Sequence, residues 1–385
     1  MPYPPYFTET HDQFRAMVRR FVAMEITPYV RQWEEAGEFP LAILRRMGEL
    51  GLLGVHYPVE VGGQGGDYFM AVVLAEELSR CGAGGFPMAV AVQTDMATPP
   101  IGKFGTPAQI EHYLKPALSG AKLACLGITE PNHGSDVASI ETHAIRDGDE
   151  WVIHGSKVFI TNGPRADFMT LVARTGDAPG YQGLSLFLLD LDLPGVRVMK
   201  RLNKVGMRSS DTALFYFDDV RIPADRLLGN EGQGFYHIIW ELQGERLIAA
   251  AGAVGSAQYA WEIARDYAKQ RSAFGRRLSD FQTIAHLLAE MATEIEAVRQ
   301  LTYAVAWRFA QGEVPAQEIA MAKLATAQTA NWVIDRAIQI LGGHGYVSDW
   351  PLERMWRDIR LNRIGGGTDE IMKEIIAATM GLRTE

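Results

Sequence analysis

The sequence predicts an α+β protein of three parts: an all-α N-terminal domain (1–121), a middle β-barrel-like domain (122–232) and a C-terminal four-helix bundle (233–385). Apolar residues recur at three- and four-residue intervals in the first third and again after Gly234, which is typical of helices. Between these stretches, short apolar runs are separated by turn signals such as Asp147-Gly148, which is typical of strands. A length of 385 residues also favours more than one domain.

The N-terminal part is predicted to be helical. One helix is expected to end before Pro28, because its apolar residues form a single stripe: Phe14, Met17, Val18, Phe21 and Val22. A second helix is expected over residues 41–47, where Gly51 follows as a stop signal. Residues 71–78 have helical composition again, after a glycine-rich loop.

The middle part is predicted to form strands. Its short apolar runs alternate with turn residues, and a compact β domain is expected from them: 151–153, 157–160, 168–173, 184–189 and 213–217.

The C-terminal part is again predicted to be helical. After Gly234 one apolar seam predicts a long helix packed in a bundle: Phe281, Ile284, Leu288, Met291, Ile295, Val298 and Val305. The small residues of 249–255 let another backbone, or a flat ligand, approach closely.

Composition excludes several classes of protein. The net charge of −9 argues against a general nucleic-acid binder, which needs a positive surface. Cys81 and Cys125 are the only cysteines, so a disulfide framework is not expected and a reducing compartment fits. No signal-peptide pattern and no apolar stretch of ~18–20 residues is present. We therefore expect a cytoplasmic protein without nucleic-acid or membrane partners.

No metal site is predicted. The sequence lacks the Cys-x-x-Cys spacing of thiolate zinc sites. A di-iron bundle needs Glu-x-x-His pairs on facing helices, and the pair Glu130 and His133 contains Pro131 and falls in a loop.

Four segments carry residue types suited to a nucleotide cofactor. Pro131 and Gly134 make 127–136 an irregular loop with hydroxyls and free backbone amides, which can meet a heteroaromatic ring and a pyrophosphate. The segment 159–163 presents an aromatic and a hydroxyl side chain at the end of a strand. Arg271 begins the third segment, and its guanidinium matches phosphate oxygens bidentately. The fourth is the pair of glycine-rich stretches 339–345 and 364–370.

Together these segments resemble the acyl-CoA dehydrogenase family, and the resemblance covers essentially the whole chain. It rests on matches at 127–139, 157–163 and 271–275, the spacing from Arg271 to Gln282, and the Gln-x-x-Gly-Gly segment. The closest likeness is to the long-chain and isovaleryl-CoA branch. The resemblance implies an FAD-dependent oxidoreductase that forms a homotetramer.

The resemblance also implies roles for individual residues. Thr129 and Thr161 would bind the isoalloxazine ring by hydrogen bonds, Phe159 would lie against it, and Ser135 would sit where pyrophosphate and pantetheine meet. The adenine and pyrophosphate half would be held, partly from a neighbouring subunit, by Arg271, Phe274, Gln282, Gln339, Gly342 and Gly343. Other cofactor-binding residues would be Leu126, Ile128, Gly134, Thr368, Asp369 and Glu370.

The catalytic base departs from the commonest family pattern. Removing a proton α to a thioester needs a carboxylate near neutral pH, which burial of a glutamate can provide. Many members carry this glutamate at the position of Gly366, which has no side chain here. The long-chain and isovaleryl members supply it from a Glu-Arg pair, matched by Glu245-Arg246, so Glu245 is the expected base. Arg246 and Tyr236 are weaker candidates for substrate contacts.

The implied reaction is α,β-dehydrogenation of an acyl-CoA to a trans-2-enoyl-CoA, with the β hydride passing to flavin N5. The backbone N–H of Gly366 would help to polarise the thioester carbonyl, and electron-transfer flavoprotein is the expected acceptor. An acyl-CoA oxidase, a flavin monooxygenase and a non-catalytic flavoprotein remain alternatives. The acyl chain length and branching stay open.

Overall fold

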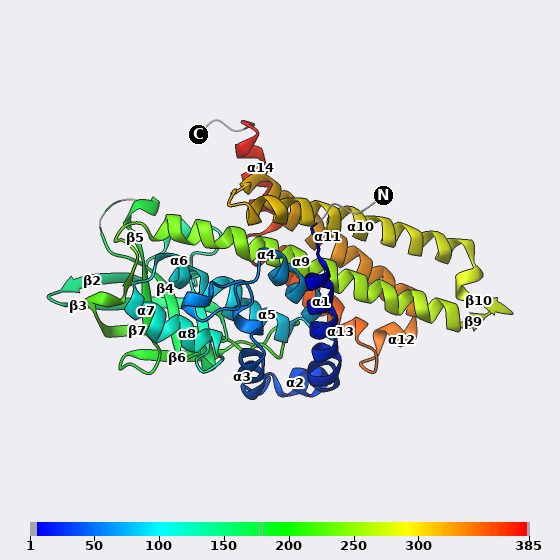
Figure 1. Ribbon diagram of the computed structural model, residues 1–385, viewed down its shortest axis with the longest axis horizontal. Coiled ribbons are helices and arrows are strands. Elements are labelled where there is room, and N and C mark those ends of the chain that lie inside the picture. Colours follow the sequence, from blue (N-terminus) through cyan, green and yellow to red (C-terminus); the bar gives the residue numbers. More distant parts are fainter. Residues whose placement is uncertain (1–5, 177, 179, 383–385) are drawn as a thin grey trace.

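The computed structural model describes residues 6–176, 178 and 180–382. Figure 1 shows an elongated molecule with the sheet at one end, long helices running from it to the other end, and the N-terminal helices packed alongside. The predicted order of helices, strands and helices is confirmed. The N-terminal helices are α1 (Glu9–Phe21), α2 (Val30–Ala36), α3 (Ala42–Glu49), α4 (Tyr68–Leu78), α5 (Gly85–Ala91), α6 (Pro99–Phe104), α7 (Pro107–Gln109) and α8 (Lys115–Leu118).

The predicted N-terminal helices correspond to α1, α3 and α4. Val18 and Phe21 of α1 are buried with Leu74 of α4 in one apolar core. Ile248, from the C-terminal part, joins the same core. The N-terminal helices and α9 therefore share this core.

The middle part is an eight-stranded sheet in the order β6-β7-β3-β2-β4-β5-β8, with β1 pairing parallel to β4. Its strands are β1 (Ala124–Gly127), β2 (His143–Asp147), β3 (Glu150–Thr161), β4 (Phe168–Arg174), β5 (Leu184–Asp190), β6 (Val196–Arg201), β7 (Thr212–Pro223) and β8 (Leu227–Leu228). Among the described residues β6 and β8 do not pair, so the predicted barrel-like closure is not confirmed.

The C-terminal part contains three long helices that pack on one another, α9, α10 and α11, while α14 packs mainly on α11. The predicted seam lies on α10, where Leu288, Met291, Ile295, Val298 and Val305 are buried. The four-helix bundle is not confirmed in that form. The elements are α9 (Gly234–Gln270), β9 (Ser272–Ala273), β10 (Arg276–Arg277), α10 (Gln282–Ala310), α11 (Ala316–Leu341), α12 (Gly343–Tyr346), α13 (Leu352–Ile359) and α14 (Asp369–Thr379).

The small residues of α9 allow α4 to approach closely. A Cβ atom on Gly255 would lie 2.3 Å from the backbone oxygen of Glu76, closer than real Cβ contacts come. Position 255 therefore requires glycine. The sequence left open whether another backbone or a flat ligand approaches this stretch, and at Gly255 it is the backbone of α4.

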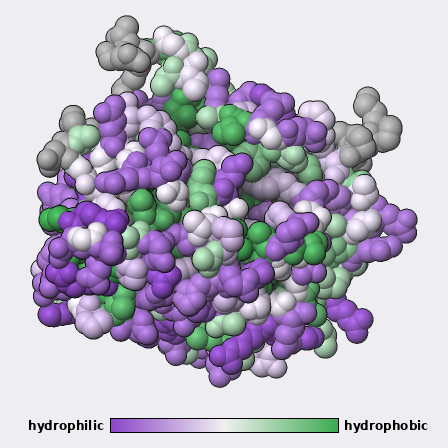
Figure 2. Space-filling view, turned by 60° about the vertical axis from the view of Figure 1, so that its left-hand side comes forward, coloured by the Kyte–Doolittle hydropathy of each residue, from purple (hydrophilic) through white to green (hydrophobic). Residues whose placement is uncertain are grey.

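The surface is that of an ordinary globular chain. Figure 2 shows hydrophilic side chains over most of the face in view, with hydrophobic ones gathered only in small patches. Within the described ranges, no helix combines the length and the apolar character needed to cross a membrane.

Candidate active site

The carboxylate of Glu245 and the glycine turn at Gly366 lie against each other. Glu245 projects from α9 and is buried, with 9% of its surface exposed. A Cβ atom on Gly366 would lie 3.0 Å from Glu245 Oε1. The carboxylate therefore reaches the space that a side chain at position 366 would enter.

Two buried cations hold this turn. Arg246 Nε donates a hydrogen bond to the carbonyl oxygen of Gly366 at 2.9 Å, and Lys323 Nζ donates to that of Gly367 at 2.5 Å. The φ angles of Gly366 and Gly367 are 65° and 101°, a region that L side chains rarely adopt, so glycine suits both positions. Lys323 was missed in the sequence because it lies on α11, far from the motif that it holds.

The environment of Glu245 favours the protonated form of its carboxyl more than water does. Burial raises its pKa, although the positive charges of Arg246 and Lys323 oppose the rise. Glu241, one helical turn earlier on α9, is also buried, and within the described chain neither of its carboxyl oxygens has a hydrogen-bond partner. Burial, followed by the nearby charge of Glu245, raises the pKa of Glu241 well above its usual value.

Glu241 was also missed in the sequence. The signal was present, because residues four apart on a helix share one face.

The loop that begins the first motif is fixed by a buried ion pair. Lys157 Nζ donates to Glu130 Oε1 and to the Ile128 carbonyl oxygen, both at 2.8 Å. Glu130 also accepts hydrogen bonds from the backbone N–H groups of Glu141 and Thr142, at 2.6 and 2.9 Å. The chain is thereby held on both sides of Thr129.

Phe159 has an unusual conformation for an apolar residue. It lies at an irregularity in the pairing of β3 with β7, its φ is 63°, and 67% of its surface is exposed. Such bulges re-aim a side chain, and backbone strain of this kind concentrates at ligand sites. Val158, the residue before Phe159, donates its N–H to the Thr129 carbonyl oxygen at 2.8 Å, which ties this strand to the loop of the first motif.

The residues expected to hold the adenine half lie elsewhere. Arg271, Phe274 and Gln282 are exposed around the β9–β10 hairpin, and Phe274 is 95% exposed with a φ of 52°. Gln339, Gly342 and Gly343 are exposed around the end of α11. Figure 1 shows the β9–β10 hairpin and the end of α11 at the end of the molecule opposite the sheet. Within one chain, the residues expected to hold the adenine half therefore lie far from those expected at the flavin ring.

The remaining predicted residues have mixed settings. Gly134, Ser135 and Glu370 are exposed. Leu126 and Ile128 are half-buried and pack against the apolar core that contains β4 and β5 residues. Tyr236 is exposed at the start of α9 and contacts Tyr181.

Thr368 and Asp369, which follow the glycine turn, also stabilise the local structure. The Thr368 hydroxyl caps α14 by accepting from the N–H of Ile371. Asp369 is buried and accepts from Arg363 Nε at 2.7 Å, while its Oδ1 has no hydrogen-bond partner within the described chain.

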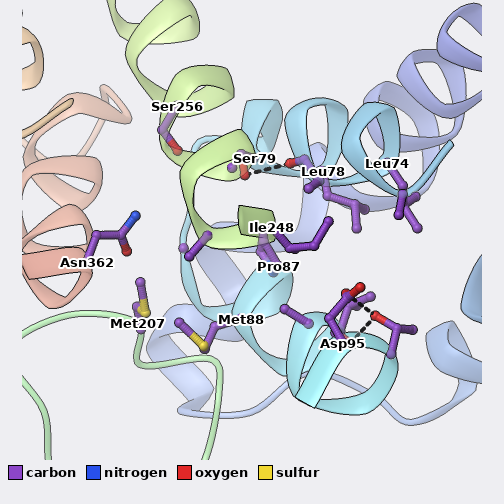
Figure 3. A pocket seen from close by; sticks show the side chains of 18 of the residues that line it. Leu74, Leu78, Ser79, Pro87, Met88, Asp95, Met207, Ile248, Ser256 and Asn362 are labelled. Atoms are coloured by element: carbon purple, nitrogen blue, oxygen red, sulfur yellow. Dashed lines mark hydrogen bonds between the residues drawn. The ribbon is translucent and has the colours of Figure 1, made fainter. Parts of the chain in front are cut away.

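An apolar cavity lies beside this site, between α4, α5, α9 and the π-helical segment Val92–Ala97 (Figure 3). Leu74, Leu78 and Met88 line it together with Ile248, which is one turn after Glu245 on α9. Two acids, the half-buried Asp95 and the buried Asp358, also line the cavity, and both were missed in the sequence.

Comparison with known proteins identifies the class to which this fold and site belong. Three family models match successive parts of the chain: the N-terminal, middle and C-terminal domains of acyl-CoA dehydrogenases, over residues 8–121, 125–220 and 232–381. These are flavin-dependent oxidoreductases. The chain belongs to the acyl-CoA dehydrogenase family, as the sequence predicted, and is an oxidoreductase of fatty acyl-CoA dehydrogenation.

Individual relatives cover nearly the whole chain. The chain is 40% identical to a probable acyl-CoA dehydrogenase of Bacillus subtilis, over 96% of this chain and 97% of that one. It is 38% identical to the long-chain specific mitochondrial enzyme of Sus scrofa and 40% identical to the short-chain specific one of Bos taurus, over 96% of this chain and 86% and 89% of theirs. Both branches are matched, so these identities do not select one.

Solved structures agree in fold. A probable acyl-CoA dehydrogenase from Mycobacterium abscessus has a TM-score of 0.95 at 42% identity, over 98% of this chain and 100% of that one. A glutaryl-CoA dehydrogenase from Mycobacterium smegmatis, solved in complex with FADH2, has a TM-score of 0.94 at 27% identity, over 100% of this chain and 97% of that one.

Proposed function

We propose that the protein binds FAD and dehydrogenates a fatty acyl-CoA to its trans-2-enoyl-CoA, with Glu245 as the base that removes the α proton. The observation that carries this proposal is the contact between the Glu245 carboxylate and the turn at Gly366. This contact supports the proposal because many members of the family are expected to carry their carboxylate on the turn itself.

The residues around Glu245 suit this task. The carboxylate takes the α proton and becomes a neutral acid, which its buried setting tolerates well. The backbone N–H of Gly366 donates to the thioester oxygen, a type of interaction worth about 3–4 kcal/mol to the transition state. Arg246 and Lys323 keep that turn in place through their hydrogen bonds to its carbonyl groups.

Bound FAD would accept the hydride from the β carbon. The residues proposed to hold its ring are Thr129, Phe159 and Thr161, and the exposed, strained Phe159 supports this assignment. The acyl group would enter the apolar cavity between α4, α5 and α9, whose lining can bury hydrocarbon. Ser135 and Tyr236 remain proposed contacts of the CoA part.

We also propose that the flavin site is completed by a second copy of the chain, as in a homotetramer. The support is the position of Arg271, Phe274 and Gln282, which lie exposed at the far end from Phe159. Electron-transfer flavoprotein is the proposed acceptor. One similar structure carries that protein in its title, with a TM-score of 0.95 and 35% identity.

Anaerobic mixing of the flavin-containing protein with acyl-CoAs tests the reaction. Wild type should bleach at the flavin absorption band, whereas Glu245→Gln should bind FAD and acyl-CoA but bleach at least about a thousandfold more slowly, a barrier increase of about 4 kcal/mol. Bleaching of the variant at the wild-type rate would exclude Glu245 as the base. Peroxide release in air, compared with reduction of electron-transfer flavoprotein, separates a dehydrogenase from an oxidase.

A further inference from the structure

The cavity lined by Ile248, one turn after Glu245, has a polar end at Asp95. The Asp95 carboxyl faces the cavity, and its one hydrogen bond comes from the neighbouring Thr94 hydroxyl at 2.6 Å. No lysine, arginine or histidine of the described residues forms an ion pair with it. Burial, reinforced by the charge of Glu245, raises its pKa to about 7 against the opposing hydrogen bond from Thr94.

His56 is a second polar group at this end. Its ring lies against Tyr57 and Tyr68, with centroids 4.7 and 6.2 Å apart, and it makes no hydrogen bond within the described chain. Burial, with a further contribution from the charge of Asp95, raises the pKa of both tyrosines. Burial also lowers the pKa of His56 to about 4, so the imidazole is neutral at pH 7.

The Asp95 end lies near the proposed reaction centre, apolar side chains line the middle of the cavity, and Ser256, Asp358 and Asn362 line its far end. Figure 3 shows Asp95 below Ile248, while Ser256 lies further along α9 and Asn362 on the opposite side. From Ile248 to Ser256 the helix rises about 12 Å, and along this length Leu74, Leu78 and Met88 line the cavity. A ligand would therefore meet Asp95 close to its reacting carbons and hydrocarbon-like walls beyond.

A plain alkyl chain would fit this arrangement poorly. It would cover the Asp95 carboxyl and the His56 imidazole without offering either a hydrogen bond, and unsatisfied buried polar groups are costly. A hydroxyl group both donates and accepts, so it can pair with Asp95 in either protonation state and with a neutral imidazole. An ammonium group would match only the ionised carboxylate and would lose its own hydration on entry.

On the basis of the proposed function, we propose that Asp95 and His56 make the enzyme selective for acyl-CoAs that carry a hydroxyl group a few carbons beyond the β carbon, followed by an apolar remainder. The reaction itself is unchanged. The α proton and β hydride leave as before, and the hydroxyl is bound without being transformed. Asp95 is a specificity-determining residue in this scheme.

The test compares substrates that differ by one hydroxyl. Anaerobic stopped-flow reduction of the FAD-containing protein would be measured with octanoyl-CoA, γ-hydroxyoctanoyl-CoA and δ-hydroxyoctanoyl-CoA over a range of concentrations. For wild type, one hydroxylated substrate should exceed octanoyl-CoA in reduction efficiency by about tenfold, the value of one good hydrogen bond. Asp95→Leu should bring this ratio to about one, whereas Asp95→Asn should keep most of it, because an amide still donates and accepts.

Ser256→Ala, at the end of the cavity far from Asp95, is the matched control and should keep the wild-type ratio. Flavin absorbance and thermal melting confirm that each variant is folded and loaded. Equal efficiency of wild type on all three substrates, or an Asp95→Leu variant with an unchanged ratio, would overturn the selectivity and leave the proposed dehydrogenation intact. Failure of every acyl-CoA to reduce the flavin would overturn the proposed function and this inference together.

Discussion

Replacing Lys157 by methionine should destabilise the protein and weaken its hold on FAD. Methionine keeps the length and apolar stem of the side chain but removes the ammonium group. Lys157 and Glu130 are both buried, with side-chain exposures of 0% and 4%. The substitution therefore leaves a buried carboxylate without its cation and the Ile128 carbonyl without its donor.

The magnitude follows from what Glu130 retains. Removing one partner of a buried ion pair costs about 3–5 kcal/mol. Glu130 keeps two backbone N–H donors, from Glu141 and Thr142, so the loss should lie near the lower limit, about 3 kcal/mol. Thr129 lies between the two residues that lose a partner, so its loop should loosen and the dissociation constant for FAD should rise.

Urea unfolding followed by circular dichroism, together with titration of the apoprotein with FAD, measures both effects. Lys115→Met is the matched control, because Lys115 pairs with Glu111 at 2.6 Å on an exposed helix surface and should cost at most about 0.5 kcal/mol. Adding Glu130→Gln to Lys157→Met should recover part of the loss. A Lys157→Met variant no less stable than the Lys115→Met control would refute the reasoning.

Three further predictions concern α9. With Glu245 as the proposed base and its pKa raised above 4.5 by burial, flavin reduction by acyl-CoA should slow as pH falls through that higher pKa. A stopped-flow profile with its midpoint at or below 4.5 would contradict this. Glu241→Leu should raise the unfolding free energy by about 1–3 kcal/mol in urea, because it removes a buried carboxyl without partners; a loss of stability would show that the carboxyl is satisfied. Gly255→Ala should lower the melting temperature by several degrees, because its Cβ would lie 2.3 Å from the Glu76 backbone. Gly252→Ala is the control and should not lower it, because the nearest atom to its Cβ is the Ser79 hydroxyl at 3.0 Å. Equal melting temperatures of the two variants would contradict this reasoning.

The sequence was informative where local pattern decides structure. The stripe of Val18 and Phe21 marks α1, and the apolar seam with Met291 and Ile295 marks α10, because a 3.6-residue period requires only a helix and a core on one side. Sheet closure depends on whether β6 meets β8, and alternation along single strands carries no information on that pairing.

In the candidate site, too, some residues could be predicted from the sequence and others depend on how the chain folds. Glu245 was identifiable because the resemblance pointed to a Glu-Arg pair once position 366 proved to be glycine. Lys323, on α11, and Asp95, before α6, carry no motif of their own, and only the folded chain brings them toward α9. Phe159 was expected at a ring, but its left-handed backbone depends on an irregular register with β7 that no spacing rule reveals.

The gap between Glu245 and Gly366 has a consequence for how such enzymes diverge. Two stretches of chain, more than a hundred residues apart, border one small volume, and a carboxyl group can be installed there from either side. With the turn anchored through its own carbonyl oxygens, moving the acid from one stretch to the other need not disturb the backbone that faces the thioester. The sequence position of the proposed proton acceptor can therefore change while its position in the folded protein stays the same.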